Sequence, residues 1–145
     1  MKQKIEGGKK IKIVINSCFG GFGLSDEAFE MYLEKKGIKY YKYQDGGLFS
    51  STYYAVPKEK YDKFREIWRK EDGNYKRINA KHWYLSDNDI KRDDPVLVEV
   101  VKKLKNKAGG RCAELKIVTI PDGTDWEIDE YDGLETVEEK HKSWN

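Results

Sequence analysis

The first apolar residues of the chain alternate with polar ones. Ile11, Ile13 and Ile15 fall at every second position, which is the spacing of side chains on one face of a β-strand. A glycine-rich segment follows at 18–24, and glycine clusters are typical of turns. The pattern therefore predicts a strand and then a tight turn, after a basic leader at 1–10.

Three stretches have the three-and-four spacing of an amphipathic helix. The first begins at Ser25, a good N-cap residue, and ends at Gly37. The second covers 58–70 and carries aromatic residues on one face. The third begins at Asp94, an N-cap residue followed by proline; its apolar stripe runs to Ala108, and the glycines at 109–110 end it. These patterns predict three helices.

Short runs rich in aromatic and β-branched residues predict further strands. They lie at 38–43, 52–56, 112–120 and 124–131, with an extended pair within 75–85. We expect 112–120 and 124–131 to pair as a hairpin, and 135–144 to form a closing helix. Strands and helices both alternate and pair locally, so the predicted fold class is α+β. We expect a single domain over 11–145, with an antiparallel sheet and three to four helices.

Composition limits the class of protein. The chain has 145 residues, of which 38% are hydrophobic and 13% aromatic, enough for one domain with a real core and too apolar for a disordered segment. No apolar run approaches the length of a membrane span, and no secretory signal is recognisable. Two cysteines are a poor disulfide framework. These features predict a cytoplasmic protein that does not enter a membrane.

Charge is unevenly distributed along the chain. The net charge is +2, but the residues from 121 onward carry −7 and the first 120 therefore carry +9. A basic body with an acidic C-terminal part suggests an anionic ligand on the body, or pairing between the two parts of neighbouring subunits. The alternative is a solvated surface with no partner, because surface charge is a weak guide to function.

The glycine-rich segment 18–24 has two interpretations. Backbone amides in such loops can approach phosphates closely. However, no Lys-Ser/Thr pair follows the glycines, and Ser25, Asp26 and Glu27 already place oxygens and negative charge at the start of the helix. The sequence therefore favours a tight turn that requires positive φ angles.

Catalytic residues are hard to find. His82 and His141 are the two histidines, and neither has a triad signature nearby. Cys18 precedes the glycine turn, where acidic neighbours would disfavour a thiolate, so a structural thiol is the better interpretation. If the protein were an enzyme, Glu114 or Asp94 would be the candidate bases.

Metal-binding patterns are also missing from the sequence. Cys18 and Cys112 lack the paired spacing of a structural zinc site. The acidic stretch near the C-terminus fails as a calcium-binding EF-hand loop because Glu130 stands where glycine is required. We therefore expect no metal and no cofactor.

Two arginines lie close to the predicted ends of the third helix. Arg92 immediately precedes the helix start, and Arg111 follows the glycines at its end. A guanidinium offers a planar fork of donors suited to phosphates or to a nucleobase edge. Alternatively, Arg92 pairs with Asp93 or Asp94 and Arg111 complements the helix C-terminus. Spacing alone does not choose between these interpretations.

The order of several segments resembles a phage protein family. These segments are IVINSCFGGFGLS at 13–25, RDDP at 92–95, LVEVV at 97–101, AELKIV at 113–118, IPD at 120–122, WEIDEYDG at 126–133, EEKH at 138–141 and Trp144. Together they are similar to the first described family of Thoeris anti-defence proteins. The similarity covers 11–25 and 92–144, whereas the tyrosine-rich middle at 38–90 matches poorly.

The resemblance implies a sponge, meaning a protein that captures a signal without cleaving it. The implied ligands are the cyclic ADP-ribose isomers that bacterial TIR-domain proteins make, and the implied compartment is the cytoplasm of the infected bacterial host. A homo-oligomer, as a dimer or a hexamer, is implied as well. A second site for cyclic di- or trinucleotides of CBASS immunity is left open by the resemblance.

The resemblance also implies site residues. The family's ligand-binding arginines correspond to Arg92 and Arg111, and Asn88 and Phe64 are the candidates for a contributing asparagine and aromatic residue. Loss of one buried bidentate arginine should cost about 2–5 kcal/mol of binding free energy. On this basis Arg92→Ala should abolish capture and leave the fold intact. The alternatives are an enzyme that degrades the same signal and a small nucleic-acid-binding domain.

Overall fold

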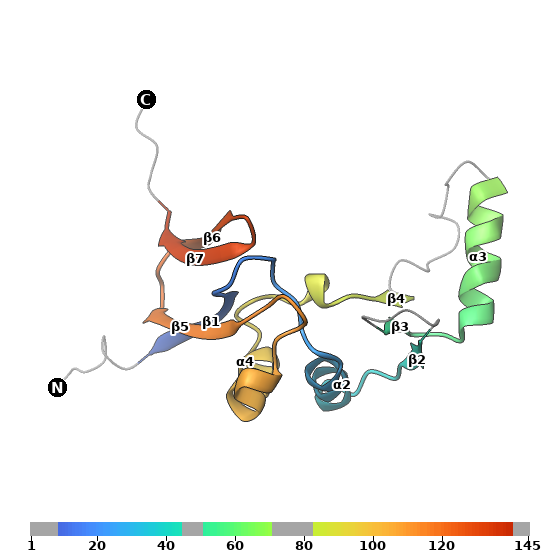
Figure 1. Cartoon of the computed structure of the whole chain (residues 1–145), viewed down its shortest axis with the longest axis horizontal. Helices are drawn as coiled ribbons and strands as arrows, with labels where there is room; N and C mark the ends of the chain where they lie inside the picture. Colours follow the sequence, from blue (N-terminus) through green and yellow to red (C-terminus); the bar gives the residue numbers. More distant parts are fainter. Residues whose placement is uncertain (1–8, 45–50, 71–82, 141–145) are drawn as a thin grey trace.

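The computed structural model describes residues 9–44, 51–70 and 83–140, with side chains described up to residue 66 in the second of these ranges. In these ranges the chain forms seven strands and three α-helices, and all strand pairs are antiparallel. The strands are divided among three small sheets, which Figure 1 shows spread along one elongated molecule. The α+β fold class is confirmed, but the antiparallel strands do not form one continuous sheet.

The central sheet pairs β1 (Lys10–Asn16) with β5 (Leu115–Pro121). Val14 on β1 lies opposite Ile117 on β5. Three successive residues of β1, Ile13, Val14 and Ile15, are all buried, so both faces of this strand are covered. The sequence predicted the strand, but its alternating pattern predicted only one buried face.

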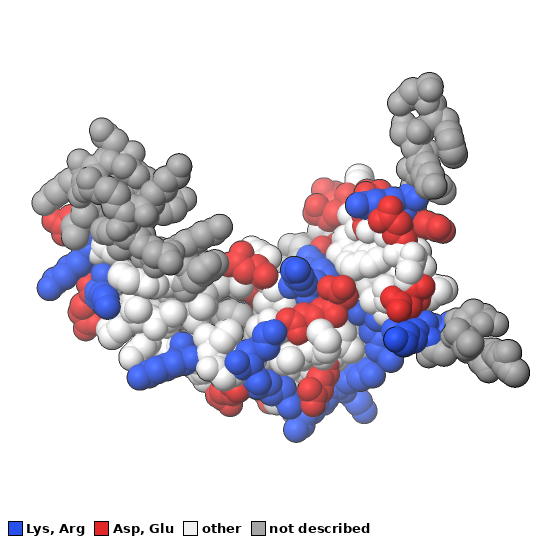
Figure 2. All heavy atoms as spheres, turned by 180° about the vertical axis from the view of Figure 1, so that it is seen from behind, with Lys and Arg blue, Asp and Glu red and all other residues white. Residues whose placement is uncertain are grey.

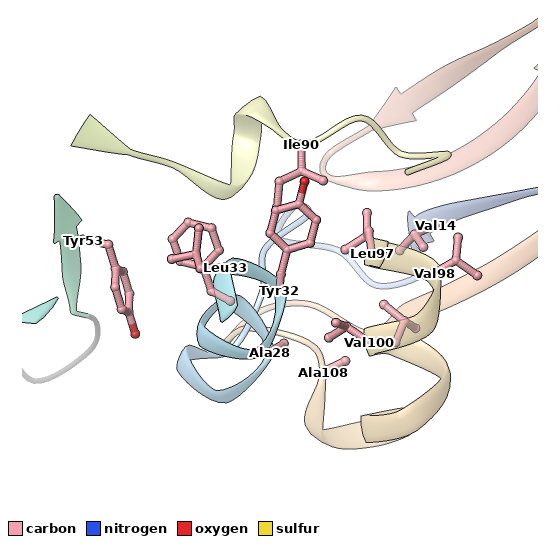
Figure 3. Packing of buried hydrophobic residues seen from close by; sticks show 12 residues of the cluster. Val14, Ala28, Tyr32, Leu33, Tyr53, Ile90, Leu97, Val98, Val100 and Ala108 are labelled. Atoms are coloured by element: carbon pink, nitrogen blue, oxygen red, sulfur yellow. The ribbon is translucent and has the colours of Figure 1, made fainter. Parts of the chain in front are cut away.

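Two helices pack together, and one of them covers this sheet. They are α2 (Asp26–Lys35) and α4 (Pro95–Leu104), and α4 also contacts β1 and β5. Their buried faces form the core together with β1, as Figure 3 shows for Leu97, Tyr32 and their neighbours. The core residues on the two helices are Ala28, Phe29, Tyr32, Leu33, Leu97, Val98, Val100 and Val101.

The predicted starts of both helices are confirmed by their caps. The Ser25 side chain accepts a hydrogen bond from the Ala28 amide, and the Asp94 side chain accepts one from the Val96 amide. Each cap satisfies a backbone donor that the first helical turn leaves unpaired. The predicted end of the third helix is wrong, because α4 stops at Leu104 and a 3-10 turn, η3 (Lys105–Lys107), continues the chain.

The tyrosine-rich middle of the chain forms a second sheet in the order β2-β3-β4. Its strands are β2 (Tyr41–Tyr43), β3 (Thr52–Tyr54) and β4 (Tyr84–Leu85). Figure 1 shows this sheet between α2 and the more distant helix α3 (Lys58–Lys70). The predicted extended pair within 75–85 is represented by β4 alone, because 75–82 lie outside the described residues.

The third sheet is a hairpin of β6 (Trp126–Tyr131) and β7 (Leu134–Glu139). It corrects two predictions. The closing helix at 135–144 is wrong, because most of the described part of that segment is the strand β7. The expected hairpin between 112–120 and 124–131 is also wrong, because β5 pairs with β1 and β6 pairs with β7.

The physical reason for the hairpin lies in its two-residue turn. Asp132 and Gly133 both have positive φ angles, 51° and 89°, as a tight hairpin turn with the right-handed twist of the strands requires. Beyond it, Glu135 and Val137 alternate with exposed residues, which is a strand pattern. In the part of the chain that the structure describes, no helix combines the length and apolarity needed to cross a bilayer.

Candidate functional site

Arg92 lies in a polar centre where the glycine-rich segment, β1 and β7 meet. Its Nη1 and Nη2 donate to Oε1 and Oε2 of Glu135 at 2.6 and 2.8 Å. The guanidinium carbon also lies 3.6 Å from the centre of the Phe22 ring, a stacking contact that suits the flat guanidinium. The sequence suggested that Arg92 pairs with Asp93 or Asp94. In the structure Arg92 pairs with Glu135, which lies 43 positions further along the chain.

Asn16 completes this centre at the end of β1, and its side chain is fully buried. The amide nitrogen donates to the carbonyls of Cys18 and Gly133, and the amide oxygen accepts from the backbone amides of Cys18 and Glu114. All four hydrogen-bonding positions of the side chain are therefore used. The Asn16 backbone amide donates to Glu135 as well, so the two buried polar residues form one network.

The glycine-rich segment wraps around this network. Gly20 and Gly21 have φ angles of 124° and 110°, which confirms the tight turn. A Cβ on Gly133 would lie 2.6 Å from the Gly20 nitrogen, so the hairpin turn fits against the segment only with glycine there. The amides of Gly20 and Leu24 donate to oxygens of the protein itself, an arrangement that does not favour the phosphate-loop interpretation.

The four predicted ligand-binding residues lie in different surroundings. Arg92 is largely enclosed by the polar centre. Arg111 is exposed in the turn that leads to β5, and the neighbouring Gly110 amide donates to the Gly23 carbonyl. Asn88 is exposed in the 3-10 turn η2 (Asp87–Asp89), and Phe64 packs on Trp83 with 5.5 Å between ring centres.

The environment of Arg92 changes what its substitution should do. Glu135 is buried at 8% side-chain exposure and has Arg92 as its bidentate partner. Removing one member of a buried ion pair leaves the other charge without compensation. Arg92→Ala is therefore expected to destabilise the fold, in contrast to the expectation from sequence that it leaves the fold intact.

A cleft of about 510 Å³ lies between α2 and the segment that carries β4 and η2. Its lining residues include the aromatic Phe29, Tyr32 and Tyr84 and the polar Ser86 and Asp89. Small-molecule sites have this character, with mostly apolar walls, a few polar groups and volumes of about 300–1,000 Å³. None of the four predicted residues lines the cleft, but Asn88 is adjacent in sequence to Asp89.

A second hollow, of about 600 Å³, lies between the start of β1 and the N-terminal part of α4. Lys9, Lys10 and Lys12 line it, together with Asp93 and Asp122. It offers charge but no aromatic ring among its lining residues, so it could attract an anion without selecting a base.

Comparisons of the chain with family models, curated proteins and solved structures find no match.

Asp94 is committed to several partners at the start of α4. Tyr32 donates its phenol to Asp94 at 2.7 Å, and the Lys36 ammonium lies 3.3 Å away. Burial alone would raise the pKa of Asp94, but the hydrogen bonds from Tyr32 and Val96 and the Lys36 charge hold it below its ordinary value. Burial and the bond to Asp94 raise the pKa of Tyr32. Asp94 therefore has the properties of a carboxylate that stabilises the fold. A general base, by contrast, has a pKa near 7.

The remaining candidates for chemistry are less informative. Glu114, the second suggested base, is exposed. Cys18 is half-buried and Cys112 exposed, and both are free thiols. His82 and His141 lie outside the described residues. Within 9–44, 51–66 and 83–140, no three His, Cys, Asp or Glu side chains are grouped to hold a metal ion.

Sequence reasoning missed Asn16, Glu135 and the cleft. Asn16 forms bonds to residues 98 and 117 positions away, so no local pattern identifies its role. Glu135 was assigned to a helix, which concealed its inward position on β7. One signal was available, because Asp132-Gly133 between two alternating segments is a strong hairpin pattern.

Proposed function

We propose that this protein is a phage anti-defence sponge that binds a cyclic ADP-ribose-type nucleotide and holds it without cleaving it. The observation that carries the proposal is the aromatic cleft of about 510 Å³ between α2 and β4. The resemblance of 11–25 and 92–144 to Thoeris anti-defence proteins gives the class of ligand. The homo-oligomer and the second site for cyclic oligonucleotides stay predictions from the same resemblance.

The cleft walls suit a nucleoside. Phe29, Tyr32 and Tyr84 are among its lining residues, and Tyr84 is the exposed one of the three; stacking of a base on an aromatic ring contributes about 1–3 kcal/mol. Asp89 adds a carboxylate at the cleft, and carboxylates are common partners of ribose hydroxyls. In the proposed complex the adenine lies among the rings and the ribose hydroxyls donate to Asp89.

The phosphates require donors near the cleft. The Lys36 ammonium lies 3.3 Å from Asp94 and 5.7 Å from the centre of the Tyr32 ring, and its side chain is 39% exposed, so an anion next to that wall would share this ammonium with Asp94. Asn88 is exposed within the same turn that supplies Asp89. We assign the pyrophosphate to these two side chains, and Arg92 to holding the neighbouring glycine-rich segment in place.

Sequestration requires affinity and no chemistry. A sponge that competes with a receptor needs a Kd of roughly 1 nM, which is about −12 kcal/mol. The enzyme alternative depends on Asp94 or Glu114, and neither is among the residues that line the cleft. The arrangement of the cleft therefore supports binding better than hydrolysis.

A capture-and-release assay tests this proposal. The protein is incubated with each cyclic ADP-ribose isomer, separated from free ligand, heated, and the supernatant is analysed by chromatography. We expect at least one isomer to be retained by the folded protein and recovered unchanged after heating. Retention of no isomer, or recovery of a cleaved product, would overturn the proposal.

Two sets of variants locate the ligand. Asp89→Asn and Lys36→Gln should each reduce retention by at least about tenfold, as expected for loss of one charge-assisted hydrogen bond. Lys10→Gln/Lys12→Gln removes charge from the basic hollow and should leave retention unchanged. If the lysine pair variant loses the ligand while Asp89→Asn keeps it, the ligand is in the hollow and the cleft assignment is wrong.

A further inference from the structure

The second sheet has a row of tyrosines across its three strands. Tyr41 on β2 lies opposite Tyr54 on β3, and Tyr54 lies opposite Tyr84 on β4. Residues paired in this way project from the same face of a sheet. Tyr43 lies two positions after Tyr41 on the same strand and therefore shares this face.

The other face of the sheet belongs to the protein core. Tyr53 projects there, is buried and contacts Phe29 edge-on at 5.0 Å between ring centres. Lys42 is on the same side and pairs with Glu30 and Asp26 of α2. The tyrosine row is therefore not needed to attach the sheet to α2.

Helix α3 covers only part of the tyrosine row. Tyr61 contacts both Tyr54 and Tyr84, with ring centres 4.7 and 6.4 Å apart, and Tyr54 is buried. Tyr84 and Tyr43 still expose 43% and 38% of their surfaces. Large exposed rings at both ends of one row are available to a partner.

Lysines accompany these rings. Lys39 lies 5.4 Å from the ring centre of Tyr41, Lys58 lies 5.4 Å from that of Tyr43, and Lys60 lies 5.2 Å from that of Trp83, the residue before β4. Lys58 also bonds Asp62 at 2.8 Å. Lys39 and Lys60 have no carboxylate partner among the described residues, so their charges are available. We call this surface, formed by Tyr41, Tyr43, Trp83, Tyr84, Lys39 and Lys60, the tyrosine–lysine face.

We propose that the tyrosine–lysine face binds single-stranded nucleic acid. Proteins that bind single strands combine aromatic rings on which bases stack with cations that neutralise the backbone phosphates. Tyr41, Tyr43 and Tyr84 share one side of a small sheet, with Lys39 beside Tyr41 and Lys60 beside Trp83 next to β4, and bases must be unpaired to lie on the rings. Tyr84 belongs both to this face and to the lining of the cyclic-nucleotide cleft, whereas Tyr43 is outside the cleft lining, so Tyr43→Ala tests the face separately from the cleft.

Fluorescence anisotropy with a labelled oligothymidine about 12 nucleotides long tests the proposal on the full chain. We expect saturable binding at about 50 mM salt that weakens strongly at about 200 mM, because lysine contacts release counterions. Tyr43→Ala should weaken binding roughly five- to hundredfold through loss of one stacked base. Lys39→Gln/Lys60→Gln should weaken binding and flatten its salt dependence.

Tyr131→Ala is the matched control. Tyr131 is 72% exposed on the acidic hairpin, away from this sheet, and its loss should not change oligonucleotide binding. Tyr84→Leu is a second test variant for the case that Tyr43→Ala misfolds. It removes an exposed ring from the face but keeps an apolar contact with Tyr54, so the sheet should stay folded. The proposal is overturned by absence of saturable binding at low salt, by equal affinity for duplex DNA, or by equal effects of Tyr43→Ala and Tyr131→Ala.

Discussion

Arg92 and Glu135 are the residues whose charges are most closely tied to the fold. Their side chains are 21% and 8% exposed and form two short hydrogen bonds. An ion pair taken out of water contributes little net stability, because desolvation offsets the attraction. Loss of one partner is costly, since the remaining charge keeps its desolvation penalty.

We predict that Arg92→Ala lowers the free energy of unfolding by about 3–5 kcal/mol, the range for a broken buried pair. Urea denaturation followed by circular dichroism measures this. Any loss of ligand capture in this variant then has to be compared with its loss of folded protein.

The paired variant Arg92→Met/Glu135→Leu is the control for that prediction. Because it removes both charges and keeps apolar volume, it should be more stable than Arg92→Ala, and within about 1–3 kcal/mol of the natural protein, since the buried Asn16 amide loses its acceptor on Glu135. A stability of Arg92→Ala equal to that of the natural protein would show that Glu135 does not depend on the arginine.

At the scale of elements, local sequence signals correctly predicted the starts of helices that have a capping residue at their N-terminus. Ser25 and Asp94 identify the starts of α2 and α4, and both caps are present. These signals involve contacts within three residues, which is why a sequence reveals them. The stripe on α4 was extended too far, because Ala108 is buried in the core from outside the helix.

Elements that depend on distant partners were predicted less well. Nothing within β5 indicates that it pairs with β1 at the other end of the chain. Glu135 resembles an exposed helical residue until its partner Arg92 is known. The cleft is equally inaccessible to local reasoning, because α2 and β4 are separated by about fifty residues in the sequence.

The cap of α4 leads to a prediction on pH. The folded-state pKa of Asp94 lies below the ordinary value of 3.8, so the carboxylate contributes stability that is present above that value and lost as pH falls below it. Asp94→Asn retains an N-cap but cannot titrate. We expect the natural protein to lose more unfolding free energy than Asp94→Asn when pH falls from about 5 to about 3. Parallel slopes would contradict this role for Asp94.

At the scale of the whole molecule, the charge asymmetry of the sequence becomes a spatial one. The acidic side chains of β6 and β7 gather on this hairpin, at one end of the described molecule (Figure 2). The second sheet lies toward the other end, beyond α2 (Figure 1), and the aromatic cleft lies between α2 and β4. The sequence predicted a basic body with an acidic C-terminal part, but it did not predict a cleft lined by aromatic residues.

Calorimetric titration of one steric variant tests the central claim most directly. Ala55 lines the cleft and is half-buried, so Ala55→Phe should fill the space proposed for the base, whereas Thr136→Phe places the same ring on the exposed outer side of β7. With the cyclic ADP-ribose isomer that the natural protein retains, we predict one-site binding at roughly nanomolar Kd for the natural protein and Thr136→Phe. Ala55→Phe, folded as judged by circular dichroism, should lose at least about a hundredfold in affinity through exclusion of the stacked base. Unchanged affinity in Ala55→Phe would contradict the account.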